Sequence, residues 1–118
     1  MTKTTKWLGR YGEDRACEYL LGQGYQILDR NWHNSEGELD IVVTHAKTLV
    51  FVEVKTRTSH YSGSPLEAIT QQKLGRLRRL AASWCAQRQV SNSQVRFDAI
   101  AVLVHAGKVQ IQHLKQVM

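Results

Sequence analysis

The chain has 118 residues, one proline and 42% hydrophobic residues, which fits a single domain over residues 1–118 and excludes a mainly disordered chain. Its 16 lysines and arginines exceed its 10 acidic residues, so the net charge is +6 and favours a polyanionic partner such as nucleic acid. The longest uncharged apolar stretch is far too short to cross a membrane and the polar N-terminus lacks a secretory signal, so we expect a cytoplasmic protein.

Hydrophobic spacing predicts a helix, three strands, a second helix and two more strands. Residues at helical spacing form the buried side of both helices, and Gly22 is a stop signal for the first. Pro65 is well placed in the first turn of the second helix. This order predicts an α/β fold with a mixed central sheet flanked by helices. The predicted ranges, in chain order, are 7–23, 25–32, 38–44, 48–56, 66–89, 95–104 and 109–114.

Two features of the pattern predict local packing. Strand alternation places Leu39 on the same side as Ile41 and Val43, and places Asp40 on the other side together with Glu38. Gly9 and Gly12 each weaken a helix by about 1 kcal/mol. We therefore expect another element to approach the first helix closely at these two glycines.

Three charged residues, Asp40, Glu53 and Lys55, interrupt the apolar strands. An ionised carboxylate in an apolar setting costs several kcal/mol unless it is paired or bound to a metal. Asp40 and Glu53 offer the oxygen ligands that Mg²⁺ or Mn²⁺ prefers, and such an ion activates water for phosphodiester hydrolysis. Lys55 shares a strand face with Glu53, where it would orient that water or stabilise the transition state. The alternative is a strand-end ion pair between Glu53 and Lys55, worth about 0–1 kcal/mol if exposed.

The cysteines and histidines do not form a metal motif. Cys17 and Cys85 have neither CxxC spacing nor clustered histidines, which disfavours a zinc site. The five histidines are scattered along the chain, so we assign none of them to a metal.

Several short segments carry a family resemblance and together span nearly the whole sequence: Gly9-Arg10-Tyr11-Gly12-Glu13, Gly24-Tyr25, Arg30-Asn31, Gly37-Glu38-Leu39-Asp40-Ile41-Val42, Phe51-Val52-Glu53-Val54-Lys55-Thr56-Arg57, Lys73 and Arg96-Phe97-Asp98. In these segments the chain resembles the YraN-like family of bacterial proteins. The resemblance implies a restriction-endonuclease-like fold of the PD-(D/E)XK class, which Holliday-junction resolvases share, although Leu39 stands where that class is named for a proline. It implies that Asp40 and Glu53 are the motif acids and Lys55 the motif lysine. It also implies that Glu13 completes the metal site, with Glu38 ranked below these.

Basic residues near these acids are candidates for contacts with nucleic-acid phosphates. A cluster on the second helix contains Lys73, Arg76 and Arg79, and Arg57 follows the third strand. The alternative for this cluster is a solvated helix face. Lys73, which also matches the family, is our first choice.

Two further positions have both a structural and a functional interpretation. Trp32 lies just before the acids, where it either belongs to the core or stacks on an unpaired base. Asp98 is expected to be structural, paired with Arg96 or with a backbone donor.

The sequence thus predicts a Mg²⁺-dependent or Mn²⁺-dependent DNA endonuclease that acts on branched or damaged structures. The alternative is a nucleic-acid-binding module with a vestigial, non-catalytic nuclease site. Resolvase-like proteins are often dimers, so the resemblance extends to a homodimer by analogy alone.

Overall fold

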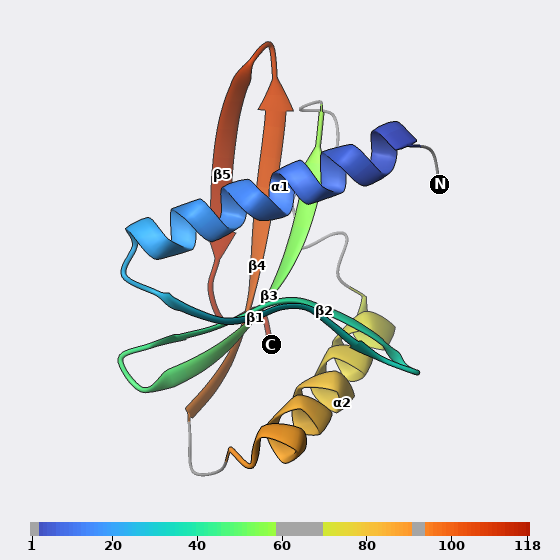
Figure 1. The fold of residues 1–118 in the computed structure, drawn as a ribbon, viewed down its shortest axis with the longest axis vertical. Coiled ribbons are helices and arrows are strands. Elements are labelled where there is room, and N and C mark those ends of the chain that lie inside the picture. The colour runs from blue at the N-terminus through green and yellow to red at the C-terminus, as the bar shows by residue number, and fades with distance from the viewer. Residues whose placement is uncertain (1–2, 59–69, 91–93) are drawn as a thin grey trace.

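The computed structural model describes residues 3–58, 70–90 and 94–118, and its elements follow the predicted order (Figure 1). Every strand begins and ends within two residues of the predicted bounds. The predicted α/β fold, with the order α-β-β-β-α-β-β, is therefore confirmed. The elements are α1 Lys3–Gly22, β1 Gln26–Asn34, β2 Gly37–His45, β3 Thr48–Arg57, α2 Gln71–Arg88, β4 Gln94–His105 and β5 Lys108–Leu114.

The strands form one mixed five-stranded sheet in the spatial order β1-β2-β3-β4-β5. Neighbouring strands are antiparallel except for β3 and β4, which run parallel from Thr48↔Gln94 to Arg57↔Leu103. Parallel neighbours need a long crossover connection, and the segment containing α2 provides it. In the spatial order of the sheet, β3 is the central strand.

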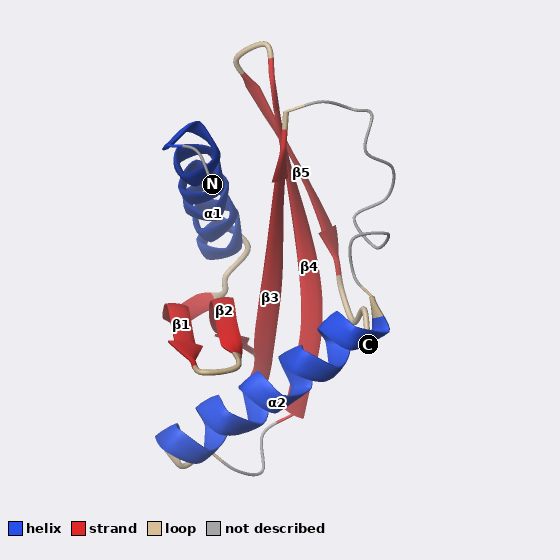
Figure 2. Cartoon of the chain, turned by 90° about the vertical axis from the view of Figure 1, so that its right-hand side faces the viewer, coloured by secondary structure: helices blue, strands red, loops and turns tan. Residues whose placement is uncertain are grey.

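The two helices pack on opposite faces of the sheet (Figure 2). On β3, Val50 and Val52 belong to the core beneath α1, whereas Leu49 and Phe51 belong to the core beneath α2. Such alternation is expected of a strand that is buried on both faces. Among the described residues, neither helix has the length and apolar character needed to cross a membrane.

The structure corrects the predicted starts of both helices. The first helix begins at Lys3, four residues before the predicted start. Residues 66–69 and Pro65 lie outside the described part of the chain, but Thr70 is extended, with φ −91° and ψ 165°, and α2 begins at Gln71. The Thr70 side chain accepts a hydrogen bond from the backbone N–H of Lys73, which makes it the N-cap. The prediction of one helix running from residue 66 through Thr70 is therefore wrong.

The predicted placement of Leu39 is also wrong. Ile41 and Val43 pack toward α1 as one group, but Leu39 packs toward α2. The partners of Ile41 and Leu39 on β1 are Arg30 and Trp32, and the residue between these two, Asn31, has a left-handed φ of 52°. The register between β2 and β3 also begins only at Ile41. Regular alternation is thus interrupted at Asp40, which lies between Leu39 and Ile41.

The first helix approaches the sheet most closely at Gly12. A Cβ atom on Gly12 would lie 1.8 Å from Oγ1 of Thr56 on β3, which leaves no room for any side chain. The predicted close approach is confirmed at Gly12 and wrong at Gly9, where a Cβ would meet nothing within 4 Å. This contact holds the next residue, Glu13, close to the end of β3.

A buried polar cluster ties the C-terminal strand to the sheet. The Asp98 side chain is fully buried and accepts hydrogen bonds from Arg96, His113 and the backbone N–H of Gln116. Burial alone would raise the pKa of Asp98, but these hydrogen bonds lower it to about 2. The predicted structural role of Asp98 is confirmed, with both Arg96 and a backbone donor as partners.

Candidate functional site

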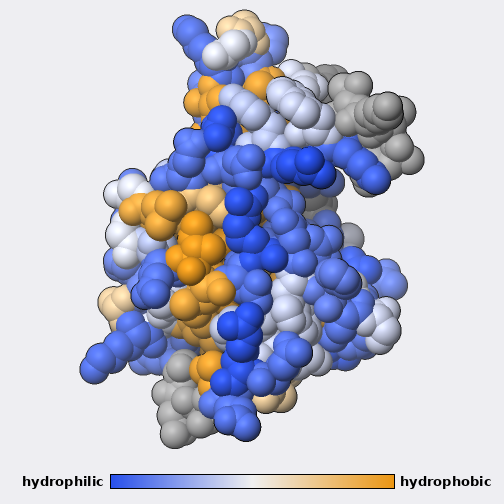
Figure 3. Space-filling view, in the orientation of Figure 1, coloured by the Kyte–Doolittle hydropathy of each residue, from blue (hydrophilic) through white to orange (hydrophobic). Residues whose placement is uncertain are grey.

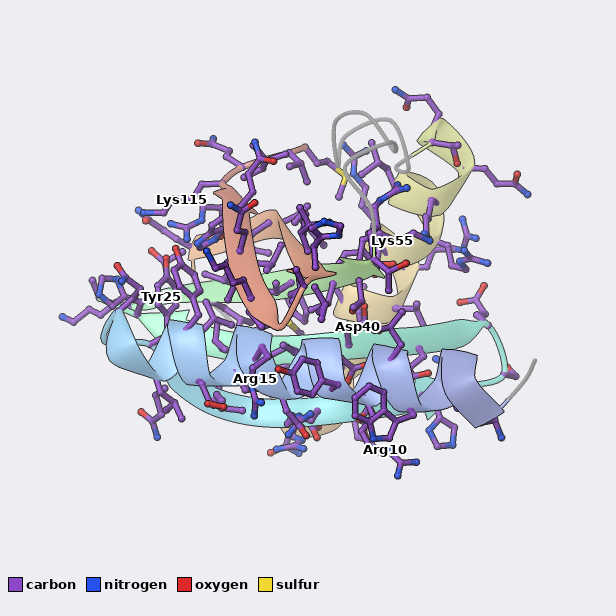
Figure 4. The ribbon with its side chains drawn as sticks, turned by 90° about the horizontal axis from the view of Figure 1, so that it is seen from above. Arg10, Arg15, Tyr25, Asp40, Lys55 and Lys115 are labelled. Atoms are coloured by element: carbon purple, nitrogen blue, oxygen red, sulfur yellow. The ribbon has the colours of Figure 1, made fainter. Side chains whose placement is uncertain are left out.

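A cleft of about 540 Å³ lies where α1 crosses the ends of β1, β2 and β3. Asp40 and Lys55 lie on the same side of α1, over the sheet (Figure 4). Three separate elements, α1, β2 and β3, therefore bring charged side chains to one solvent-accessible hollow, and β1 adds the neutral side chain of Asn31. The polar side chains in its lining are Lys6, Arg10, Glu13, Asn31, Glu38, Asp40, Lys55 and Thr56.

Asp40 is the most perturbed acid of the cleft. Its Oδ2 accepts a hydrogen bond of 2.9 Å from the backbone N–H of Val54, which fixes the carboxyl group beside β3. Burial is the largest cause that raises its pKa, and the charge of Glu53 is the second. Together with smaller contributions from Glu13 and Glu38, they raise the pKa of Asp40 to about 8. Without a cation, the Asp40 carboxyl group therefore holds its proton at neutral pH.

Asn31 joins two further acids at the cleft. Its Nδ2 donates to Oε1 of Glu13 at 2.7 Å and to Oε1 of Glu38 at 2.8 Å. Burial and the charges of Glu38 and Asp14 raise the pKa of Glu13, and they outweigh the Asn31 hydrogen bond and the charge of Arg30. Asparagine tolerates the left-handed conformation found here better than most residues do. The sequence analysis missed this bridging role, for which membership of the matching Arg30-Asn31 run was the only signal.

Glu53 and Lys55 on β3 have different surroundings. The Glu53 carboxylate lies 3.4 Å from Nζ of Lys73 on α2, and only 17% of its side chain is exposed. Lys55 is exposed and lines the cleft together with Asp40. The alternative of a Glu53–Lys55 ion pair is not found among the described residues, where the partner of Glu53 is Lys73.

The predicted metal ligands Glu13 and Glu53 lie near Asp40, but the three side chains do not converge on one point. Both Glu53 and Glu13 act electrostatically on the Asp40 carboxyl group. In the described part of the chain, however, no three acidic, histidine or cysteine side chains are close enough to hold one ion together. The arrangement therefore differs from the expected three-ligand set of Glu13, Asp40 and Glu53.

The predicted phosphate contacts are spread over α2 and the end of β3. Two of the four form ion pairs, Lys73 with Glu53 and Arg79 with Glu36 at 3.1 Å. The Arg76 stem lies against Gly37, and Arg57 is half-buried at the last position of β3. Trp32 packs against the core beneath α2 and donates its indole N–H to Gln87, which supports the core interpretation.

Comparison with known proteins matches residues 12–102 to the family model described as "Uncharacterised protein family UPF0102". The chain belongs to family UPF0102. A UPF0102 protein of Beutenbergia cavernae is 48% identical over 111 residues, covering 93% of this chain and 94% of that protein. A UPF0102 protein of Clavibacter michiganensis subsp. michiganensis is 50% identical over 100 residues, covering 85% of each chain.

The UPF0102 match includes the cleft acids and the β3 residues Glu53 and Lys55. It therefore confirms the YraN-like resemblance found in the sequence. The cleft residues Lys6 and Arg10 lie before the matched segment.

Proposed function

We propose that this UPF0102 protein is a Mg²⁺-dependent endonuclease that hydrolyses phosphodiester bonds in DNA. The observation that carries the proposal is the cleft in which Asp40, surrounded by other acids, faces the same hollow as Lys55. Carboxylates that destabilise one another are expensive in a domain of this size unless a cation compensates them. The cleft of this UPF0102 protein thus contains acids that disfavour one another's ionisation, and a nuclease site that binds a cation would explain why they are there.

The donor set fits Mg²⁺ held by two carboxylates and several waters. Mg²⁺ binds through one or two carboxylates and retains much of its water shell, so it does not require three protein ligands at one point. Asp40 and Glu53 would hold the ion, because Glu53 is the largest charged contributor to the raised pKa of Asp40. When bound, the ion supplies a Lewis acid that activates water and offsets charge on the phosphate.

The other cleft residues supply positioning and binding. Lys55 projects a flexible cation into the cleft, where it stabilises the charge that develops on the phosphate. Asn31 fixes the carboxylates of Glu13 and Glu38, which keeps the acidic side of the cleft in place. The net charge of +6 draws the DNA backbone to the protein and makes binding weaken as salt rises.

A DNA-binding module without catalysis is the second candidate. It is favoured by the ion pair between Lys73 and Glu53, which gives Glu53 a partner without any metal. It also agrees with the lack of a three-ligand group among the described side chains. This candidate predicts salt-dependent DNA binding but no specific uptake of a divalent ion.

A cleavage assay separates the two candidates. Labelled duplex, flapped and four-way DNA, with matched RNA, are incubated with the wild type, Asp40→Asn, Glu53→Gln and Lys55→Met in Mg²⁺ or Mn²⁺. The control is Glu18→Gln, which removes an acid that is 60% exposed on α1 and paired with Arg15. We expect the wild type and control to cut and the Lys55 variant to cut about 100-fold or more slowly. If the wild type binds but never cuts in either metal, the nuclease proposal fails and the binding module stands.

A further inference from the structure

Three side chains form a row along the outer surface of α1. The rings of Trp7 and Tyr11 are stacked, with centroids 5.3 Å apart and planes 16° from parallel. The guanidinium of Arg15 lies 4.7 Å from the centre of the Tyr11 ring. Residues four apart occupy the same side of a helix, so the helix itself holds this row in place.

The row lies beside the cleft. Lys6 and Arg10 line the cleft, and each precedes a member of the stacked pair by one residue on α1. Successive residues of a helix point about 100° apart, so the aromatic rings lie on the side of α1 next to the basic edge of the cleft. The face that carries α1 is mostly hydrophilic, with hydrophobic residues in a band left of the centre and in a smaller cluster near the top (Figure 3).

Trp7 is exposed in a way that core packing does not explain. It is 62% exposed, the largest value among the exposed large hydrophobic residues of the described chain, whereas Trp84 is 2% exposed in the core beneath α2. A rigid aromatic ring flanked by cations matches a nucleobase joined to a phosphate backbone, since bases stack on aromatic side chains and the cations contact phosphates. Bases inside a duplex have both faces covered, so only unpaired bases can stack in this way.

We infer that the Trp7–Tyr11 stack is a binding surface for an unpaired DNA base next to the cleft. This rests on the proposed function and names its substrate class: DNA that carries single-stranded nucleotides beside the bond to be cut. The row selects such DNA over continuous duplex by stacking, while Lys6 and Arg10 hold the adjoining backbone.

Binding measured without cleavage tests the inference. A fluorescently labelled duplex with a short single-stranded flap, and the same duplex without it, are titrated by anisotropy in EDTA with the wild type, Trp7→Ala and Trp7→Phe. Leu21→Ala is the matched control, because Leu21 is 57% exposed near the other end of α1. Circular dichroism melting checks that each variant is folded.

We expect Trp7→Ala to weaken flap binding at least about fivefold, the lower range for losing one base–aromatic stack, and to leave duplex binding within about twofold. Trp7→Phe should restore most of the flap affinity, and Leu21→Ala should change neither affinity. Equal effects of Trp7→Ala on both DNAs, or no effect on the flap, would overturn the inference. These two binding results would not contradict the nuclease proposal. That proposal fails if the wild type cuts no DNA.

Discussion

Replacing Asp40 by asparagine should make the protein more stable at neutral pH. Asparagine has nearly the same shape, and its side-chain oxygen can still accept the 2.9 Å hydrogen bond from Val54 N–H. The substitution removes only the ionisable group, whose charged form is disfavoured most by burial and by the charge of Glu53. It therefore isolates the electrostatic cost of the cleft from its packing.

The pKa of Asp40 sets the size and sign of the effect. It rises from 3.8 to about 8, so the folded protein holds this proton more tightly than the unfolded chain does. Stability from this group is therefore lost as pH rises from about 4 to about 8. A solution at pH 7 lies about three pH units above the ordinary pKa of 3.8, so keeping the proton on Asp40 costs the folded protein about 4 kcal/mol at 1.4 kcal/mol per unit. Because Asp40 is partly open to solvent, we expect Asp40→Asn to gain about 2–4 kcal/mol at pH 7.

Urea unfolding at pH 5, 7 and 8 measures this directly. The advantage of Asp40→Asn should grow across the series, whereas Glu18→Gln should stay within about 0.5 kcal/mol of the wild type, as surface substitutions usually do. Adding Mn²⁺ at pH 7 should stabilise the wild type but not Asp40→Asn. A variant that is less stable than the wild type at pH 7, or an advantage that does not change with pH, would refute the reasoning about this cleft.

Three further predictions concern the packing and the charges around the site. Gly12→Ala should lower the free energy of unfolding by about 1–3 kcal/mol in thermal unfolding, because its Cβ collides with Thr56. Gly9→Ala should raise the free energy of unfolding by up to about 1 kcal/mol, and equal effects of the two substitutions would contradict the close approach at Gly12. Asp98→Asn should lower the free energy of unfolding in urea by about 3 kcal/mol, because it leaves Arg96 without its buried ionised partner. A loss under about 1 kcal/mol would show that the fold does not depend on this cluster. Because the pKa of Asp98 falls to about 2, the wild type should lose about 2 kcal/mol as pH falls from about 4 to 2, a loss that Asp98→Asn should not show in acid titrations.

The parts of the fold that follow local patterns could be predicted from the sequence. Strand β3 is buried on both faces, so its alternating residues fix which side chains meet each helix. Gly12 was recognisable because a glycine inside a helix is unfavourable without a packing reason. The start of α2 was missed because a proline in a favourable position suggested an earlier beginning than the Thr70 cap allows.

The parts of the site that depend on contacts between distant segments could not be predicted. Asn31 bridges Glu13 and Glu38 because three elements converge, and no local spacing indicates that convergence. The pairing of Lys73 with Glu53 joins α2 to β3 across 20 positions of sequence, so the lysine appeared only as one member of a basic helix face. Leu39 packs on the side opposite to the predicted one because regular alternation is interrupted at Asp40, beside the left-handed Asn31 of β1, and periodicity alone does not reveal such an interruption.

Calorimetric titration with Mn²⁺ tests most directly whether the acids around Asp40 hold a divalent cation. Titrations at pH 7 in two buffers with different ionisation enthalpies also count the protons released on binding. We expect the wild type to take up the ion with release of a proton from the cleft, and Asp40→Asn to show no comparable uptake. Absence of binding by the wild type, or equal binding by Asp40→Asn, would contradict the account.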